Sequence, residues 1–190
     1  MSKYYLAFDC ETTGLLSHCN VLTCYFVILD NQLNIIDELE LNIKYSYYIV
    51  YTQAMRVNKI DLIKHDKIAI NQKKANELLI NFLSQYSKYK LIGHNIKFDI
   101  DMLKSNLILS KEEIKKYFDL QNIYDTYKIA KLLKSQNKIN KCQSLSLSKI
   151  CYYFDITNSI SDSTEEFHNA KYDTLCTIEL FKKLIELKKK

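Results

Sequence analysis

The sequence predicts an α/β fold in which helices flank a β-sheet, and three observations support this. The chain opens with apolar runs typical of strands, and further along short strands alternate with helical patterns. Of its 190 residues 47% are hydrophobic, so the chain can bury a sizeable core. It contains no internal repeat and no linker, and we therefore expect a single domain over residues 1–190.

Three strands are expected first. Residues 4–8 are apolar on both faces, and two longer runs, 21–29 and 33–43, follow them. The polar residues 30–32 between the two longer runs mark a turn. Together the three runs predict a β-meander at the beginning of the chain.

Helical patterns begin in the middle of the chain. From Gln72 to Tyr86 the apolar residues are spaced three, one, three, one and three positions apart, which places them on one face of a helix. A short strand over 90–93 is expected next, followed by a helix that continues after Asp99 as far as Leu107.

The last third of the chain continues this alternation. We expect a short strand over 121–124, helices over 126–134 and 145–154, a polar loop over 157–166 and a final helix from about Asn169. Strands and helices in this order favour an α/β sheet.

The composition favours an intracellular protein, cytoplasmic or nuclear, without a membrane partner. No run of roughly 18 uncharged apolar residues is present, and Asp9 interrupts the first apolar segment before a signal sequence could form. The 27 basic residues exceed the 22 acidic ones, and the net charge of +5 is compatible with a polyanionic partner. The six cysteines lack zinc-ligand spacing, so we expect reduced thiols in the core.

Glycine occurs only twice and proline is absent, so each glycine is expected to meet a requirement of the backbone. Gly14 follows Asp9 and Glu11, and Gly93 directly precedes His94. We expect either a close approach of the backbone or a positive φ at both glycines.

Asp9 and Glu11 form the first group of candidate functional residues. They are two positions apart on a strand, so their side chains point to the same face. Two ionised carboxylates at the end of an apolar strand are unfavourable unless they are paired, and a divalent cation that prefers oxygen ligands removes this conflict. The alternative is a solvated surface pair, since Asp-x-Glu is a common sequence.

The second group lies in residues 93–99, where a strand ends and a helix begins. Asn95 is expected to cap the helix, and Asp99 is expected to face back toward the strand end. Under the alternative, His94 and Asn95 only satisfy the loop backbone, and Asp99 stabilises the first helical turn through the helix dipole.

His168 and Asp173 form the third group, about a turn and a half apart at the start of the last helix. A helix start can direct both side chains into one cleft. The alternative is an exposed histidine near a cap and an acidic residue in an exposed first turn. The conjunction of all three groups decides between these alternatives.

Together the three groups resemble the motifs of the DEDDh family of 3′→5′ exonucleases, and among them the proofreading epsilon subunit of bacterial DNA polymerase III. The matching segments are 8–15, 94–99 and 168–173, in the family's order and at near-usual separations. Weaker agreement at 124–126 and 144–147 extends the resemblance over nearly the whole chain.

The resemblance implies an RNase H-like mixed β-sheet and a hydrolase that cleaves phosphodiesters with two Mg²⁺ or Mn²⁺ ions. Asp9 would bridge both ions, and Glu11 and Asp173 would complete the ion beside the attacking water. Asp99 would support the second ion, and His168 would act as the general base.

The resemblance also implies substrate-binding residues around the metal site. Leu15 is similar to a residue that wedges against the terminal bases, although its alternative role is a core contact at the strand end. Lys97 and Lys171 would lie nearest the scissile phosphate. The complete set is Thr12, Gly14, Leu15, His94, Asn95, Lys97 and Lys171.

Two segments depart from the family pattern. Relatives often carry His-Gly before an isoleucine where this chain has residues 57–60, and residues 43–48 replace a proline-bearing stretch. Because these segments help to hold the substrate in the family, the departures concern substrate preference and not the chemistry. Asp125, in a weakly matching segment, is expected to cap the next helix rather than to bind metal.

We therefore expect a 3′→5′ exonuclease that releases 5′-mononucleotides from single-stranded or frayed DNA ends, in proofreading or repair, with a DNA polymerase as a candidate partner. Two alternatives stay open. One is an RNA-directed 3′→5′ exoribonuclease of the same fold, and the other is a non-catalytic module that binds nucleic acid or a polymerase. The absence of one ligand carboxylate would indicate the second alternative, and all four are present.

Overall fold

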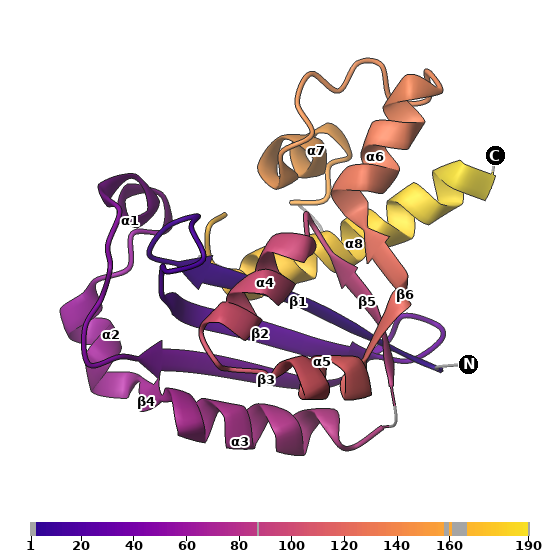
Figure 1. The fold of residues 1–190 in the computed structure, drawn as a ribbon. Helices are drawn as coiled ribbons and strands as arrows, with labels where there is room; N and C mark the ends of the chain where they lie inside the picture. The colour runs from indigo at the N-terminus through magenta and orange to yellow at the C-terminus, as the bar shows by residue number, and fades with distance from the viewer. Residues whose placement is uncertain (1–2, 87, 158–159, 161–166, 190) are drawn as a thin grey trace.

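One mixed β-sheet organises the chain, and helices lie on both of its faces (Figure 1). The computed structural model describes residues 3–86, 88–157, 160 and 167–189. Most of the polar loop predicted over 157–166 lies outside these residues. The arrangement confirms the predicted α/β fold. None of the described helices is both long and apolar enough to cross a membrane.

The six described strands follow the order β4-β3-β2-β1-β5-β6. β1, β2 and β3 form the predicted meander, in which neighbouring strands are antiparallel. β5 runs parallel to β1, and β6 runs parallel to β5, so the sheet is mixed. The strand bounds are Tyr4–Thr12 (β1), Val21–Leu29 (β2), Ile35–Lys44 (β3), Ile70–Asn71 (β4), Tyr89–Gly93 (β5) and Phe118–Asp125 (β6).

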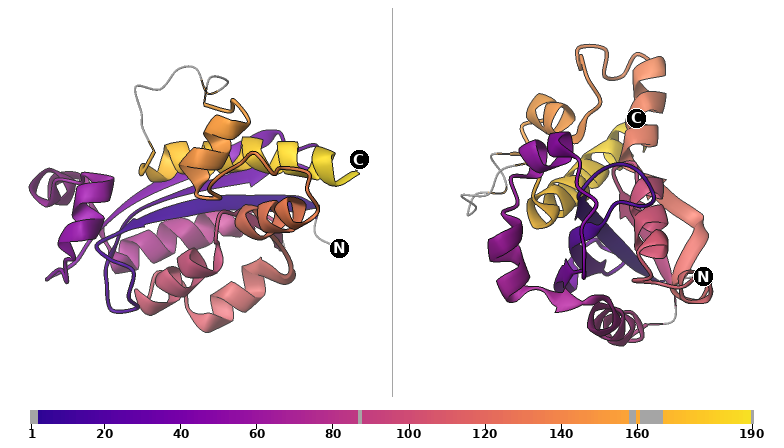
Figure 2. Two further views of the ribbon diagram at one scale, coloured as in Figure 1. Left: turned by 90° about the horizontal axis from the view of Figure 1, so that it is seen from above. Right: turned by 60° about the vertical axis from the view of Figure 1, so that its left-hand side comes forward.

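The helices divide between the two faces of the sheet (Figure 2). α3, α4 and α5 contact one face, while α8 crosses the other and is contacted in turn by α6 and α7. α1 and α2 lie beyond the end of the sheet where β1 finishes. The helix bounds are Thr52–Asn58 (α1), Leu62–Ile68 (α2), Gln72–Leu83 (α3), Lys97–Ser105 (α4), Lys111–Tyr117 (α5), Thr126–Ser135 (α6), Leu147–Tyr153 (α7) and Ala170–Lys189 (α8).

Buried apolar side chains hold these layers together. On the face covered by α3, the rings of Phe8 and Phe26 lie 5.3 Å apart and share a cluster with Leu79. On the opposite face Val27 shares a cluster with Phe181 of α8. Because successive strand residues point to opposite faces, β1 and β2 contribute to both cores. A further cluster joins α6, α7 and α8.

Some elements were not predicted from the sequence. α1, α2 and α5 have seven residues each, which is too short for an amphipathic period to stand out. α5 nevertheless begins with a recognisable signal, because Ser110 and Glu113 form a capping box in which each side chain accepts the other residue's amide. β6 begins earlier than predicted, at Phe118.

The prediction that the helix after Asp99 continues to Leu107 is wrong. α4 ends before it, and Leu107 is 75% exposed with a φ of 55°. The cause is the buried Asn106, whose side chain accepts the amide of Val21 and donates to the carbonyl of Cys19. These bonds tie the end of α4 to the loop between β1 and β2 and turn the chain away from the helix.

Close approach explains both described glycines, and neither has a positive φ. A Cβ on Gly14 would lie 2.6 Å from the sulfur of Cys19 and 2.7 Å from the ring of Tyr51. A Cβ on Gly93 would lie 2.6 Å from the Cβ of Ile96. The six cysteines are buried and free, as predicted.

Candidate active site

The end of β1 carries Asp9 and Glu11 on one face of the sheet. β1 is a central strand, and the alternate residues Phe8 and Cys10 point into the core on the other face. β5 pairs with β1 only as far as Ala7, so the sheet opens beyond this residue. A crevice at the carboxyl ends of parallel strands is the usual ligand site of such sheets.

α8 brings a third carboxylate to the same place. Asp173 lies in the first turn of α8 and accepts the backbone amide of His168 at 3.3 Å. Carboxylate oxygens of Asp9, Glu11 and Asp173 lie within 4.8 Å of one another. The structure thus unites three of the four predicted metal ligands in one cluster that could hold a cation.

Asp99 lies beside this cluster. It occupies the first turn of α4 and is 3% exposed. Its Oδ1 accepts the backbone amide of Cys10 at 3.2 Å, so the side chain faces the end of β1. Burial and the neighbouring charge of Asp9 both raise the pKa of Asp99 well above its usual value.

Burial also makes ionisation of the other three carboxylates unfavourable. It raises the pKa of Asp9 to about 7, and burial together with the charge of Asp9 raises the pKa of Glu11 to about 8. Burial, together with the charges of Asp9 and Glu11, raises the pKa of Asp173 to about 9. Within the described part of the chain, these carboxylates form no ion pair with a basic side chain. Clustered oxygen ligands without a protein cation fit Mg²⁺ or Mn²⁺.

His168 has a left-handed backbone with a φ of 75° just before α8. Its backbone amide donates to Asp173, and its side chain lines a cavity beside the carboxylates. Partial burial and the ammonium group of Lys59 lower the pKa of His168. The lowered pKa favours a neutral imidazole near pH 7, which can accept a proton.

This cavity has a volume of about 370 Å³. Glu11, residues 57–60 at the end of α1 and residues 167–171 before and within α8 line it, together with polar side chains of β2 and β3. Residues 57–60 are one of the two segments that depart from the family pattern. The structure therefore places that departure in the wall of the candidate active site.

Asn58 and Lys59 are site residues that the sequence analysis did not single out. Asn58 is buried and donates to the carbonyl of Thr12 at 3.1 Å, which ties the end of α1 to the end of β1. Lys59 lies in the cavity wall next to it. The only signal for these two residues in the sequence was their position in residues 57–60, the segment that departs from the family pattern.

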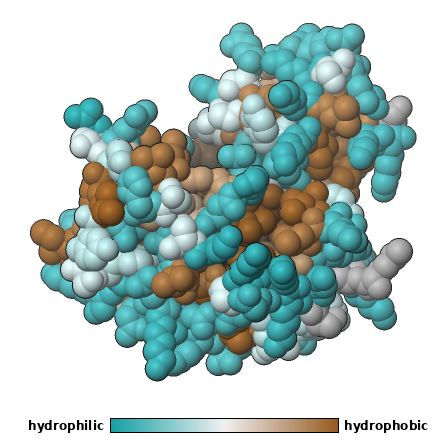
Figure 3. Space-filling model, viewed as in Figure 1, coloured by the Kyte–Doolittle hydropathy of each residue, from teal (hydrophilic) through white to brown (hydrophobic). Residues whose placement is uncertain are grey.

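The loop after β1 presents Leu15 to solvent. The hydroxyl of Thr12 donates to the carbonyl of Gly14 at 2.7 Å, and Gly14 packs against the ring of Tyr51. Leu15 is 80% exposed, so the alternative of a core contact is excluded. Apolar surface also gathers around α1 and α2 on this side of the molecule (Figure 3).

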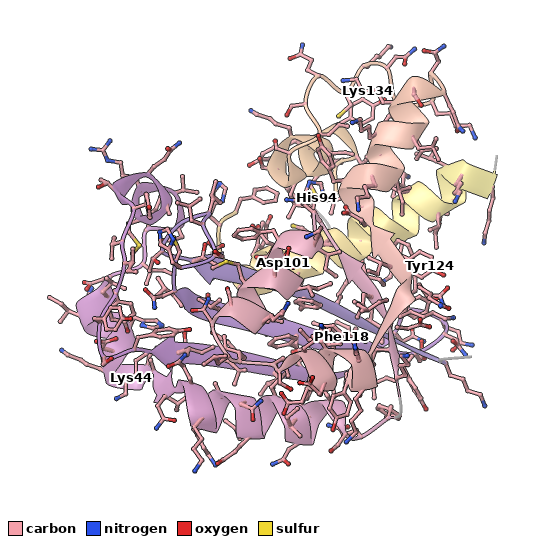
Figure 4. All side chains as sticks on the ribbon, viewed as in Figure 1. Lys44, His94, Asp101, Phe118, Tyr124 and Lys134 are labelled. Carbon is pink, nitrogen blue, oxygen red and sulfur yellow. The ribbon has the colours of Figure 1, made fainter. Side chains whose placement is uncertain are left out.

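His94, which is labelled in Figure 4, is held by protein groups on both of its ring nitrogens. Nε2 donates to the carbonyl of Leu145 at 3.0 Å, and Nδ1 lies 2.9 Å from the hydroxyl of Thr126. These contacts correspond to the alternative in which His94 satisfies neighbouring loop groups. They join the end of β5 to the start of α6 and to the segment before α7.

Asn95 does not cap α4, contrary to the prediction. Ile96 occupies the N-cap position and forms no side-chain cap bond. Asn95 precedes Ile96 and has a φ of 64°. The backbone amide of Asn95 donates to the side chain of Asp125 at 3.1 Å. Asp125 also accepts the amides of Tyr127 and Lys128, which confirms that it caps α6.

The two predicted phosphate-binding lysines differ in their surroundings. Lys97 is exposed and pairs with Asp101, one turn later on α4. Lys171 lines the cavity, and its ammonium group lies 5.8 Å from the centre of the Tyr25 ring. Of the two, Lys171 is the one held at the cavity wall.

Comparison with known proteins finds similarity over almost the whole chain. The exonuclease (RNase_T) family model matches residues 6–181. Ribonuclease T of Wigglesworthia glossinidia brevipalpis is 31% identical over 173 residues, which cover 87% of this chain and 71% of that protein. The DNA polymerase III subunit epsilon of Buchnera aphidicola subsp. Baizongia pistaciae (strain Bp) is 26% identical over 184 residues, which cover 91% and 68% of the two chains.

Solved structures share the fold at lower identity. The zinc-bound complex of E. coli exonuclease I with single-stranded DNA superposes with a TM-score of 0.74 at 14% identity, over 99% of this chain and 41% of that one. Exonuclease I of Methylocaldum szegediense gives a TM-score of 0.70 at 17% identity, over 97% and 40%. This chain thus spans less than half the length of these solved structures.

Proposed function

The chain belongs to the exonuclease family, and we propose that it is a metal-dependent 3′→5′ exonuclease that releases 5′-mononucleotides from single-stranded or frayed DNA ends. Its RNase H-like sheet and DEDDh-type nuclease class follow from the family and the fold. The proposal also includes the direction of cleavage, the substrate and the products. It further includes the roles of the site residues, the single-domain organisation and the intracellular location.

The cluster of Asp9, Glu11 and Asp173 is the observation that carries the proposal. These carboxylates are held together by two rigid elements, β1 and α8, in surroundings that disfavour their charge. Bound Mg²⁺ or Mn²⁺ would make a water nucleophilic and neutralise charge on the scissile phosphate. In the proposal Asp9, Glu11 and Asp173 would hold one ion, and the adjacent Asp99 would help to hold a second one.

His168 is proposed as the general base. Its pKa is lowered by burial and by Lys59, so the imidazole is largely neutral near pH 7. The hydrogen bond that its backbone amide donates to Asp173 holds the backbone beside the carboxylates and leaves the ring to receive the proton of the attacking water.

The proposed substrate is a single strand with a free 3′ end. Exonuclease I structures with the same fold were solved with single-stranded DNA or bound oligonucleotides. In this chain the exposed Leu15 could separate terminal bases, and Lys171 could contact phosphate from the cavity wall. Thr12, Gly14 and the backbone of Asn95 would shape the pocket around the terminal nucleotide.

RNA is the second candidate substrate. The relative named ribonuclease T is 31% identical to this chain, which covers 71% of its length. This similarity supports an exoribonuclease of the same mechanism. A role in proofreading beside a DNA polymerase is supported by the epsilon relative, at 26% identity.

Digestion of labelled strands tests the proposal. DNA and RNA oligonucleotides of one sequence, labelled at the 5′ or at the 3′ end, are incubated with Mg²⁺, Mn²⁺ or EDTA. We expect the 5′-labelled strand to shorten progressively and the 3′ label to appear at once as a mononucleotide. Digestion that is equally fast in EDTA would contradict the metal assignment, and faster digestion of RNA would favour the second candidate.

A further inference from the structure

We infer that a second cavity, beside the carboxylate site, binds a nucleotide of the bound strand that lies beyond the two joined by the cleaved bond, by stacking its base on Tyr152 and contacting its phosphate with Lys59. The inference rests on the proposed function and extends it along the strand. The cavity has a volume of about 500 Å³ and lies between the end of α1, α7 and the start of α8. This size is in the range of small-molecule binding sites.

The second cavity adjoins the first one. Val57, Lys59, Phe167 and His168 line both of them. A strand with a phosphate over the carboxylates can therefore reach the second cavity by passing His168 and Lys59. The two cavities together offer room for more than the nucleotide that is removed.

α7 supplies an aromatic surface to the second cavity. Tyr152 is 61% exposed, and its ring meets that of Phe167 edge-on at a centroid distance of 5.6 Å. Phe167 in turn meets Tyr172 edge-on at 5.1 Å. These contacts fix an exposed ring in the cavity wall. Aromatic rings that are held in this way are the stacking platforms of proteins that bind single strands.

Lys59 supplies the charge. It caps the C-terminus of α1 with a φ of 56°, and its ammonium group is near enough to His168 to influence it. Among the described residues that line the second cavity, none is acidic. A phosphate there would meet Lys59 and the hydroxyl of Ser148. The combination of cation, hydroxyl and ring favours a nucleotide over an apolar peptide.

The length dependence of cleavage tests the inference. Tyr152→Ala is compared with the parent on an octanucleotide and on a dinucleotide, and the measured quantity is the ratio of kcat/KM between the two. We expect this ratio to fall about 5- to 150-fold, which corresponds to the loss of one base–aromatic stack. Tyr152→Phe keeps the ring and should restore the ratio.

Tyr153→Ala is the matched control. Tyr153 is the next residue on α7 and is 39% exposed, but it packs on Phe154 and lines neither cavity. We expect Tyr153→Ala to leave the ratio unchanged. An unchanged ratio in Tyr152→Ala, or an equal fall in Tyr153→Ala, would overturn the inference.

A binding measurement separates the inference from the proposed function, because it needs no cleavage. The chain has no tryptophan, so Tyr152→Trp introduces a single indole, which can be excited at a wavelength that the tyrosines do not absorb. In an Asp9→Asn background with Mg²⁺, octamers of thymidylate or uridylate should quench this fluorescence, and Tyr153→Trp should respond less. The two oligonucleotides distinguish DNA from RNA.

The outcomes distinguish the two claims. Quenching without any nuclease activity in the Tyr152→Trp single variant would contradict the proposed function alone. Absence of quenching with normal cleavage would contradict the second cavity alone.

Lys59 is tested by salt dependence in the same assay. Lys59→Asn keeps a residue that tolerates a positive φ. Binding should weaken, and the slope of log K against log salt should flatten by about 0.7, the value for one phosphate contact on a single strand. An unchanged slope would remove Lys59 from the site.

Discussion

Asp9 is unfavourably placed for a carboxylate unless a cation is bound. It lies on a central strand beside Glu11, and burial raises its pKa to about 7. Removing its charge should therefore have opposite effects on activity and on stability. The expected loss of activity follows from its proposed position between both ions, and the expected gain in stability follows from the relief of burial and repulsion.

We predict that Asp9→Asn abolishes nuclease activity and raises the melting temperature of the metal-free protein. For a chain of this size each kcal/mol gained corresponds to about 2–4 °C. The measurement is a melting curve in EDTA beside a digestion assay in Mg²⁺. A markedly lower melting temperature would mean that Asp9 has a structural role, and retained activity would remove it from the metal site.

His168→Gln should lose about 10²–10⁴-fold in rate, which is the usual contribution of a general base. In the parent the rate should rise with pH through an ionisation below the ordinary histidine value, because the pKa of His168 is lowered. The variant should lack this rise. Titration calorimetry with Mn²⁺ provides the control: binding should persist, and its loss would show that His168 is a ligand.

At the scale of helices and strands, the sequence predicted what depends on period and local signals. The meander, α3 and the cap at Asp125 follow from patterns contained within short windows. Spacing on a strand predicted that Asp9 and Glu11 share one face, whereas their meeting with Asp173 was expected from the resemblance to the DEDDh family.

Long-range contacts could not be predicted in this way. α4 ends early because Asn106 bonds to Cys19 and Val21, far away in the sequence. Asn58 joins the site through the carbonyl of Thr12, and no periodicity encodes that bond. Asn95 was expected to cap α4 because asparagine is a common N-cap residue. Instead it lies one position before the N-cap residue and has a positive φ.

Gly14→Ala should destabilise the protein and disturb the loop that carries Leu15. The new methyl group would lie 2.6 Å from the sulfur of Cys19 and 2.7 Å from the ring of Tyr51, so these buried or packed groups must move. Overpacking of this kind costs about 1–3 kcal/mol. Urea unfolding measures the loss, and KM for a single strand should rise as Leu15 shifts. Unchanged stability would show that the loop accommodates a Cβ.

At the scale of the whole molecule, the carboxylates make the stability of the metal-free protein depend on pH. Asp9, Glu11 and Asp173 have pKa values of about 7, 8 and 9 in the folded protein, above those of an unfolded chain. The folded state therefore binds more protons, and the contribution of these groups to stability is complete below about pH 4 and is lost as pH rises toward 9.

We predict that the melting temperature in EDTA falls between pH 5 and 9, and that Mg²⁺ or Mn²⁺ reduces this fall by binding the ionised form. Asp9→Asn provides the control, because one of the titrating groups is absent and the fall should be smaller. A melting temperature in EDTA that rises over this range would contradict the assignment of raised pKa values to the carboxylates.

The position of the carboxylates at the end of the sheet also predicts the polarity of cleavage. In the proposed binding mode, the loop that carries the exposed Leu15 closes one side of the site, and the remainder of the strand leaves through the cavities beside His168. We therefore expect a strand to enter by its free 3′ hydroxyl. Single strands and mismatched 3′ termini should be degraded faster than paired ones, because fraying a duplex end costs about 1.4 kcal/mol of stacking per step.

Leu15→Ala should narrow the difference between paired and unpaired ends if this side chain separates the terminal bases. A strand with a 3′ phosphate should resist attack, because the added charge would lie against the closed end of the site. Circular single-stranded DNA provides the sharpest control, since it offers the same phosphates without an end. Rapid digestion of the circle, or products that carry a 3′ phosphate, would mean that the site cuts within a strand, and the 3′→5′ exonuclease assignment would then be wrong.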